Sequence, residues 1–340
     1  MSMKTSVAVV GCGYWGPNLM RNFAENPRSK LSWMVDLDAD RLQRCAERYP
    51  QTRSTSELAE VLADPAVSAV AIATPVSTHF RLACQSLLSG KSVLLEKPMA
   101  QTTAECRELT SLAEKNGLTL MVDHTFIYTG AVRKIRQLIS AGELGDVYYF
   151  DSVRVNLGLF QHDVNVIWDL APHDLSIMDY VLDKKPTQVS AHGACHFTGS
   201  NLENIAYLTL KFPDDTLAHF HVNWLAPAKI RRIIIGGSKK MLVYDDLSPD
   251  EKIKIYDKGL VMKNGPDADS RKFLAEYRIG DLYVPNIDTM EALKREVIHF
   301  LDCLEQRIRP ETDGPAGTRI VNILAAAQES LARDGAFVNL

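Results

Sequence analysis

The sequence predicts an α/β fold in two parts: a doubly wound parallel sheet over residues 1–125, then an α+β domain with a large, open, mainly antiparallel sheet over residues 126–340. Three observations support this prediction. A length of 340 residues fits two domains, at about 150 residues per domain. The first part alternates apolar runs with amphipathic stretches, and the second joins apolar runs by short turns.

The first part is expected to contain buried parallel strands. They are the apolar runs at 6–10, 31–36, 68–74, 92–96 and 118–123. Amphipathic stretches at 16–25 and 39–48 predict the first connecting helices. Val, Ala, Ile and Leu fill the runs almost continuously, which is typical of strands covered by helices on both faces.

The second part begins with a helix expected at 131–141, a long alternating strand at 146–157 and a helix at 172–182. Further strands are expected at 187–197, 203–212, 216–225, 231–237 and 239–246. Short turns between these runs indicate antiparallel pairing. Amphipathic stretches at 290–306 and 317–332 predict helices that pack on this sheet.

Composition excludes several classes of protein. Hydrophobic residues make up 46% of the chain and charged residues 24%, as in ordinary globular proteins. A net charge of −4 lacks the positive field that nonspecific nucleic-acid binding requires. No apolar run reaches the ~18 residues of a membrane span, and the N-terminus does not resemble a signal peptide. A cytoplasmic protein without nucleic-acid or membrane partners is therefore expected.

The cysteines and histidines do not predict a metal site. The six cysteines are not spaced like metal ligands or a redox pair. We expect buried, reduced thiols, as in most cytosolic proteins. The histidine pairs at 192/196 and 219/221 lack nearby acids or cysteines in a metal-binding pattern.

Residues 11–16, GCGYWG, form a G-x-G-x-x-G motif between the first strand and the first helix. Gly11 allows a tight turn, Gly13 lets the backbone approach a pyrophosphate, and Gly16 allows close packing of helix and strand. The free N–H groups and the dipole of the helix N-terminus favour an anion there. This context predicts a dinucleotide site, with Tyr14 and Trp15 of the motif also expected to contact the cofactor.

Asp36 ends the second strand, 20 residues after Gly16. A carboxylate at this place accepts hydrogen bonds from the adenosine ribose hydroxyls. Asp38 adds a second negative charge, and no arginine lies directly beside Asp36. Because a 2′-phosphate would meet negative charge, we expect NAD(H) rather than NADP(H).

Thr74 and Pro75 end the strand at 68–74, at the carboxyl edge of the sheet where ligands bind in this topology. Thr78 and His79 open the following helix. We expect Thr74, Pro75 and His79 to contact the cofactor, although simple helix capping explains such residues equally well.

Two further motifs resemble a known family. The strand at 92–96 continues into EKPMA at 96–100, and WDLAPHDLSIMDYVL at 168–182 contains D-x-x-x-H. With the strand-rich second half, these motifs resemble the glucose–fructose oxidoreductase and inositol dehydrogenase family (Gfo/Idh/MocA). The resemblance implies a Rossmann domain followed by an open-sheet domain. It also implies oxidation or reduction of a secondary alcohol or ketone on sugars, inositols or nucleotide-linked sugars.

The resemblance assigns chemistry to Glu96, Lys97, Asp169 and His173. Glu96 and Lys97 are expected at the cofactor, with Lys97 donating to the developing alkoxide. His173 would carry the hydroxyl proton. Asp169, four residues earlier on one helical face, would orient its ring. Alternatively, Lys97 is a surface charge, His173 a core histidine, and Asp169 the N-cap of a helix that begins near Pro172.

Substrate contacts are harder to assign. His124 and Phe126, in VDHTFIY (122–128), are candidates to face the nicotinamide or the substrate, although this stretch departs from the family pattern. Arg154 and Asn156 lie two apart on one strand and therefore face the same way. They line either the sugar site or a solvated sheet face.

An NAD-dependent oxidoreductase of a sugar or nucleotide sugar is the function we predict. The alternatives are an inositol or cyclic-diol dehydrogenase and a non-catalytic, NAD-binding sugar sensor. WGPNL (15–19) resembles family members that act on nucleotide sugars, and Trp224 is either a stacking surface or a core residue. The strands of the second part carry apolar residues at both parities, for example Ile205 and Leu208, so a homodimer or homotetramer is expected.

Overall fold

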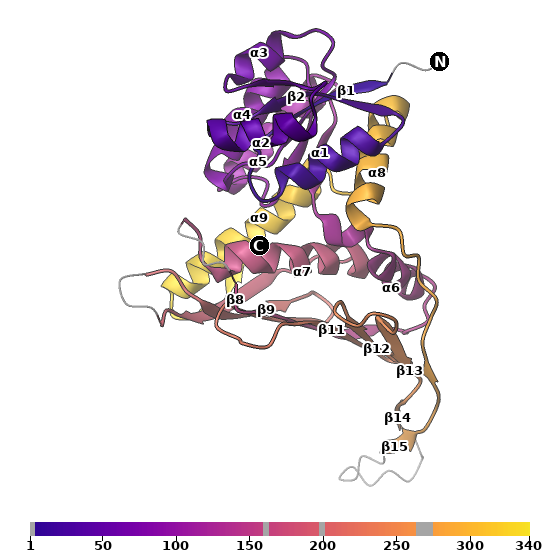
Figure 1. Cartoon of the computed structure of the whole chain (residues 1–340). Coiled ribbons are helices and arrows are strands. Elements are labelled where there is room, and N and C mark those ends of the chain that lie inside the picture. The colour runs from indigo at the N-terminus through magenta and orange to yellow at the C-terminus, as the bar shows by residue number, and fades with distance from the viewer. Residues whose placement is uncertain (1–3, 159–162, 197–200, 263–274) are drawn as a thin grey trace. The chain divides into compact units, whose positions relative to one another are not determined.

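The computed structural model describes residues 4–158, 163–196, 201–262 and 275–340 (Figure 1). The chain forms two compact units. The first consists of Met1–Thr129 and Met290–Ala325, and the second of Gly130–Thr289 and Ala326–Leu340.

The first unit contains a six-stranded parallel sheet in the order β3-β2-β1-β4-β5-β6. The predicted doubly wound fold is confirmed. Its elements are β1 (Thr5–Val10), α1 (Gly16–Glu25), β2 (Ser29–Val35), α2 (Ala39–Arg48), β3 (Arg53–Thr55), α3 (Leu58–Ala63), β4 (Ala69–Ile72), α4 (Val76–Leu88), β5 (Ser92–Glu96), α5 (Thr103–Lys115), β6 (Leu120–Asp123), the 3-10 helix η1 (Thr125–Tyr128), α8 (Ala292–Gln306) and the first part of α9 (Gly314–Ala332).

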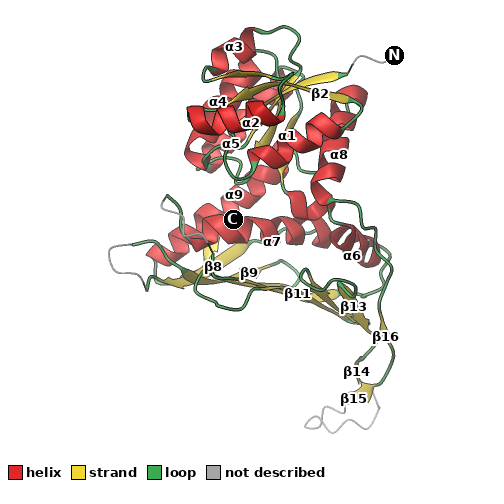
Figure 2. Ribbon diagram, in the orientation of Figure 1, coloured by secondary structure: helices red, strands yellow, loops and turns green. Residues whose placement is uncertain are grey.

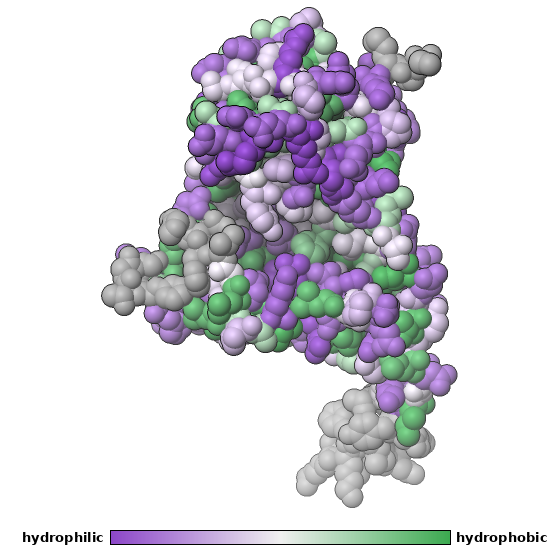
Figure 3. Space-filling model, in the orientation of Figure 1, coloured by the Kyte–Doolittle hydropathy of each residue, from purple (hydrophilic) through white to green (hydrophobic). Residues whose placement is uncertain are grey.

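The central strands form the core of this unit. Every residue of β4 is buried, as are the last four of β1 and the first four of β5. Strand order reverses between β2 and β4, which flank β1. Ligands of such sheets bind outside the carboxyl ends of the strands at this switch point. Around the sheet, α2 exposes charged residues, and Figure 3 shows a hydrophilic surface there.

Helix α8 and most of α9 belong to the first unit, whereas the sequence analysis placed them in the second domain. The reason is packing between segments far apart in the chain. Phe300 of α8 meets Phe23 of α1 edge-on, with ring centroids 6.4 Å apart. Arg28 forms ion pairs with Asp302 and Glu305, both at 2.8 Å. The amphipathic pattern of α8 predicts a buried face but does not say which sheet it covers.

The second unit is built on a nine-stranded sheet in the order β16-β13-β12-β11-β7-β10-β9-β8-β17. Neighbouring strands are antiparallel except β7 and β10, which are parallel, so the predicted mainly antiparallel sheet is confirmed. Its elements are α6 (Gly130–Ser140), β7 (Val147–Val155), α7 (Val166–Leu182), β8 (Gln188–Ala194), β9 (Ile205–Lys211), β10 (Leu217–Asn223), β11 (Ile230–Gly237), β12 (Met241–Asp245), β13 (Ile253–Tyr256), β16 (Leu282–Tyr283), β17 (Val338–Asn339), and the separate hairpin β14 (Gly259–Met262) and β15 (Ala275–Arg278).

Helices α6 and α7 lie along one face of this sheet (Figure 2). Burial alternates along the strands, as a sheet covered on one face requires. In β9 and β10, Ala206, Leu208, Ala218 and Phe220 are buried while their neighbours point to the opposite face.

Helix α7 begins at Val166, six residues before the predicted start at Pro172. The side chain of Asn165 accepts a hydrogen bond from the Trp168 N–H (3.2 Å) and caps the helix. Pro172 therefore lies inside the helix, and the alternative that Asp169 is an N-cap is wrong. Within the described ranges, none of the helices is long and apolar enough to cross a membrane.

Candidate active site

The turn from β1 to α1 shows why the motif needs its glycines. Gly11 has a φ of +101°, and a Cβ there would collide with the carbonyl oxygen of Ala73. A Cβ at Gly16 would collide with the carbonyl of Gly11. At Gly13 the nearest atom would be Nη1 of Arg41, at 3.7 Å. The fold itself thus requires Gly11 and Gly16, whereas Gly13 keeps space open for a ligand.

A cavity of about 610 Å³ opens at this turn and runs along the carboxyl ends of the strands. Most residues predicted to bind the cofactor line it, and they are Gly11, Gly13, Tyr14, Trp15, Asp36, Thr74, Pro75, Glu96 and Lys97. Gly16 and His79 are not among the lining residues. Backbone N–H groups at the N-terminus of α1 and the Asp36 carboxylate directly after β2 suit a dinucleotide.

Other lining residues were missed by the sequence analysis. They are polar or charged side chains from α2, from the segment after β3 and from α4, and include Arg41, Ser56, Arg81 and Gln85. Arg41 lies in the first turn of α2, five residues after Asp36. This short distance in the sequence could have identified it as a lining residue. The segment at 56–59 carries no motif, so only the fold brings it to the cavity.

Asp36 is held in place by the backbone. Its carboxylate accepts hydrogen bonds from the N–H groups of Cys12 and Asp38. A carboxylate offers about four acceptor positions, so the backbone contacts leave capacity for ribose hydroxyls. The negative charge is therefore fixed at the cavity wall.

The opposite end of the cavity adjoins a cluster of buried carboxyls. Glu96 pairs with Asp123 in the register of β5 and β6, and Glu296 of α8 contacts the same Asp123. Burial, and then the charge of Asp123, raise the pKa of both Glu96 and Glu296. The Trp15 indole N–H donates to Asp123 Oδ2 (2.8 Å), which ties the motif turn to β6. Burial and the nearby negative charge thus favour the neutral forms of Glu96 and Glu296.

His79 and His124 lie in the interior of the first unit. The His79 ring is 1% exposed and contacts two backbone carbonyls, those of Pro98 and Thr74. His124 is 2% exposed and directly follows β6. Neither lines the cavity, so the structure does not place them where the sequence analysis expected direct ligand contact.

In the second unit, Asp169 and His173 occupy successive turns of α7, on one side of the helix. Asp169 lies in the first turn, where the helix dipole favours a carboxylate. Its Oδ2 accepts a hydrogen bond from the indole N–H of Trp224 (2.9 Å). Trp224 is 2% exposed, so it is a core residue that orients Asp169 and not a stacking surface.

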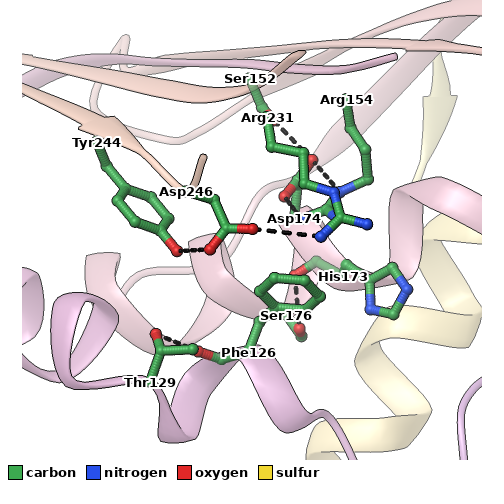
Figure 4. Close-up of polar contacts among 10 residues, drawn as sticks. All are labelled: Phe126, Thr129, Ser152, Arg154, His173, Asp174, Ser176, Arg231, Tyr244 and Asp246. Atoms are coloured by element: carbon green, nitrogen blue, oxygen red, sulfur yellow. Dashed lines mark hydrogen bonds and ion pairs between the residues drawn. The ribbon is translucent and has the colours of Figure 1, made fainter. Parts of the chain in front are cut away.

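Arg154 is a core residue too. It is 3% exposed and forms a bidentate ion pair with Asp174, at 2.9 and 2.6 Å. Ser152 donates to the same carboxylate at 2.8 Å (Figure 4). Burial opposes the charge of Arg154, but Asp174 outweighs burial and the pKa of Arg154 is raised. Neither a solvated sheet face nor an open sugar contact describes this arrangement. Asn156, one residue beyond β7, is half-buried.

Beside Arg154, Arg231 of β11 faces the same side of the sheet. Arg231 forms an ion pair with Asp246 at 3.2 Å, and the Tyr244 hydroxyl donates to Asp246 at 2.9 Å (Figure 4). Unlike the Arg154–Asp174 pair, the Arg231–Asp246 pair is partly exposed. No motif in the sequence marks Arg231, and only the register of β11 with Arg154 reveals its position near α7.

Comparison with known proteins identifies the chain. Residues 5–124 match the model of an oxidoreductase family with an NAD-binding Rossmann fold, and residues 132–243 match the Gfo/Idh/MocA C-terminal domain. The chain belongs to the Gfo/Idh/MocA family of oxidoreductases. The predicted family, the NAD cofactor and the oxidoreductase class are thereby confirmed.

Its relatives act on different substrates. UDP-N-acetylglucosamine 3-dehydrogenase of Acidithiobacillus ferrooxidans is 28% identical over 96% of this chain and 95% of its own length. The scyllo-inositol 2-dehydrogenase (NAD(+)) of Bacillus subtilis is 27% identical over 57% of this chain and 58% of its own. The structure of GenD2 from gentamicin A biosynthesis, in complex with NAD, superposes with a TM-score of 0.83 at 23% identity and covers 100% of this chain and 97% of that chain. At this identity, the likeness to the GenD2 structure shows the fold alone.

Proposed function

We propose that this family member transfers a hydride between NAD and a secondary alcohol or ketone of a nucleotide-linked sugar, in the cytoplasm. The observation that carries the proposal is the cavity in the first unit, lined by Asp36 at its adenosine end and by Lys97 at its other end. The 28% identity to a UDP-N-acetylglucosamine 3-dehydrogenase, over nearly the whole of both chains, supports the nucleotide-linked class.

When bound, NAD supplies a hydride acceptor, and the residues of the chain handle the proton and the charge. Lys97 donates a hydrogen bond to the substrate oxygen that becomes an alkoxide. Burial raises the pKa of the neighbouring Glu96, which favours its neutral form and weakens its attraction for the Lys97 charge. His173 takes the hydroxyl proton during oxidation and returns it during reduction. Asp169, held by Trp224, orients the imidazole ring.

Polar groups of the second unit are proposed to contact other parts of the substrate than the reacting oxygen. Arg231 and Asp246 offer partly exposed donors and acceptors on the same face of the sheet as Arg154. Because the charges of Arg231 and Asp246 cancel, this pair suits uncharged sugar hydroxyls. Asn156 remains a proposed contact, whereas the burial of Arg154 favours a structural role for it.

Inositol or cyclic-diol oxidation is the second candidate, favoured by the relationship to scyllo-inositol 2-dehydrogenase. A screen of NAD⁺ reduction with UDP-sugars, free monosaccharides and inositols separates the candidates. We expect turnover with one or more UDP-sugars to exceed turnover with the other classes. Faster turnover of inositols would replace the first proposal by the second.

The charge of Asp36 is expected to set the cofactor preference. Replacing Asp36 by Asn keeps an acceptor but removes the charge that a 2′-phosphate would meet. The ratio of NADPH to NADH affinity should rise at least about tenfold, which corresponds to 1.4 kcal/mol. Fluorescence titration of both reduced cofactors measures this ratio. Asp40→Asn, an exposed change in the first turn of α2, is the control and should leave it unchanged.

We further propose that the open face of the nine-stranded sheet is covered by a second copy of the chain, in a dimer or tetramer. Tyr207, Leu217 and Ile230 on this face are 42%, 47% and 39% exposed. Light scattering should give a mass of two or four times the 37.9 kDa of one chain. Leu217→Asp should shift the mass towards the monomer, whereas Leu88→Asp, an exposed leucine on α4, should not. A monomeric mass for the unmodified protein would contradict the proposal.

A further inference from the structure

Asp123 is a buried carboxyl on which side chains from several segments of the first unit converge. It ends β6, is 1% exposed and pairs with Glu96 of β5 in the sheet register. Its Oδ2 accepts the Trp15 indole N–H at 2.8 Å, and its Oδ1 accepts the Thr125 hydroxyl. The side chains of Glu96 and Glu296 also hydrogen-bond to it. Together these groups match the about four acceptor positions of one carboxylate.

Glu296 comes to Asp123 from α8, in the second segment of the unit, and is fully buried. Within the described ranges, neither of its oxygens accepts from a donor in hydrogen-bonding geometry. An ionised carboxylate is costly to bury in such surroundings, whereas the neutral acid has an O–H that can donate to Asp123. The Thr125 hydroxyl lowers the pKa of Glu296, but less than burial and Asp123 raise it.

The charges around the three carboxyls favour the same arrangement. Burial and then Asp123 raise the pKa of Glu296. For Glu96, burial and Asp123 outweigh the opposing effect of the Lys97 charge. Tyr128 also faces Glu296, and burial raises the pKa of its hydroxyl, so this neighbour adds no charge at neutral pH. The negative charge is best placed on the carboxyl that accepts from Trp15, which is Asp123.

These carboxyls are joined to the wall of the cofactor cavity. Trp15 lines the cavity from the motif turn, and Glu96 lines it from the end of β5. The indole of Trp15 reaches Asp123 across 108 residues of sequence. Asp123 and Glu296 are not among the lining residues, so they act on the cavity through the side chains that they hold.

We propose that Glu296 is a positioning residue, a neutral acid that donates its proton to an ionised Asp123, which in turn holds the Trp15 ring at the cofactor cavity. Glu96 is a second neutral donor to the same carboxylate. The C-terminal segment of the first unit thereby helps to shape the site of the nicotinamide cofactor. This role concerns cofactor binding and does not depend on which alcohol or ketone reacts.

Infrared spectroscopy of the full-length protein at neutral pH tests the proton on Glu296. The C=O stretch of a protonated carboxyl is well separated from the bands of carboxylates. Glu296→Gln should remove intensity from this stretch, whereas Glu60→Gln, an exposed change on α3, should leave it unchanged. An unchanged stretch in Glu296→Gln would show that Glu296 is ionised and would overturn the proposal.

Titration with NADH tests whether the donated hydrogen bond matters for the cavity. Glu296→Gln keeps an N–H donor, and Glu296→Leu has none. The Kd for NADH should rise about tenfold in Glu296→Leu, as expected for the loss of a hydrogen bond to a charged group, and much less in Glu296→Gln. Val297→Ala, a change at the next buried position of α8, controls for loosening of the helix and should leave Kd unchanged. Equal losses in the Gln and Leu variants would contradict the role of the donor.

Trp15→Phe tests the path from Glu296 to the cavity, because Phe keeps an aromatic ring but cannot donate to Asp123. If Glu296 acts through Trp15, adding Glu296→Leu to Trp15→Phe should raise the Kd for NADH no further. Additive losses would show that Glu296 does not act through Trp15, and the positioning role would be wrong. The titrations need no substrate, so they decide even if no sugar or inositol is turned over. The infrared test uses the nearly isosteric Gln and decides even if Glu296→Leu does not fold.

Discussion

Alanine at Lys97 or at His173 is expected to lower kcat by about 10²–10⁴-fold, the usual loss when a general acid–base group is removed. Lys97→Ala removes the donor to the alkoxide, and His173→Ala removes the proton carrier. NADH affinity should change little in either variant, because Asp36 and the motif glycines are untouched. Steady-state kinetics with the best substrate of the screen, and NADH titration, measure the two effects separately.

Two further variants refine this expectation. Asp169→Asn should lose less than His173→Ala if Asp169 orients the ring. Trp224→Phe removes the indole donor to Asp169 and should lower kcat in the same direction. Lys115→Ala, at the end of α5, and His192→Ala, an exposed histidine on β8, are the controls. Near-full turnover in both Lys97→Ala and His173→Ala would remove this site from the mechanism.

The largest stability effect is expected at the buried ion pair of the second unit. Asp174→Ala leaves the Arg154 guanidinium buried without its carboxylate, and breaking such a pair typically costs about 3–5 kcal/mol. Denaturant unfolding of the variant measures the loss. Glu143→Ala breaks the solvent-exposed pair with Lys240 and should unfold close to the unmodified protein.

A double replacement checks the reason for that loss. Arg154→Met with Asp174→Leu removes both charges and fills the site with apolar groups, which is often neutral or stabilising for a buried pair. We expect the double variant to be more stable than Asp174→Ala alone. If Asp174→Ala costs less than about 1 kcal/mol, water reaches the guanidinium and the site is more open than its burial indicates.

Local signals in the sequence predicted most of the secondary structure. The helices α1 and α2 and the strand β5 have the predicted bounds, because apolar periodicity, glycines and caps act over a few residues. The start of α7 was predicted six residues late. Pro172 suits a first helical turn, but the Asn165 cap together with tertiary packing carries the helix past it.

The candidate site was predictable where a motif sits at a strand end, as for Asp36, Thr74 and Lys97. It was not predictable where a residue depends on a partner far along the chain. Arg154 is a core residue because it forms an ion pair with Asp174 of α7. Arg231 comes near α7 because it lies directly beside Arg154 on the neighbouring strand. His79 is likewise buried, and its ring contacts the carbonyl oxygen of Pro98, 19 residues away.

The division of the chain has a practical consequence. The first unit is made of two segments, and α9 starts in this unit and ends in the other. A fragment cut after Thr129 would therefore lack α8, leaving Phe23 without Phe300 and Arg28 without its acidic partners. The nicotinamide-dependent half of this enzyme is thus not a detachable module, and shuffling it between family members requires exchanging both segments together.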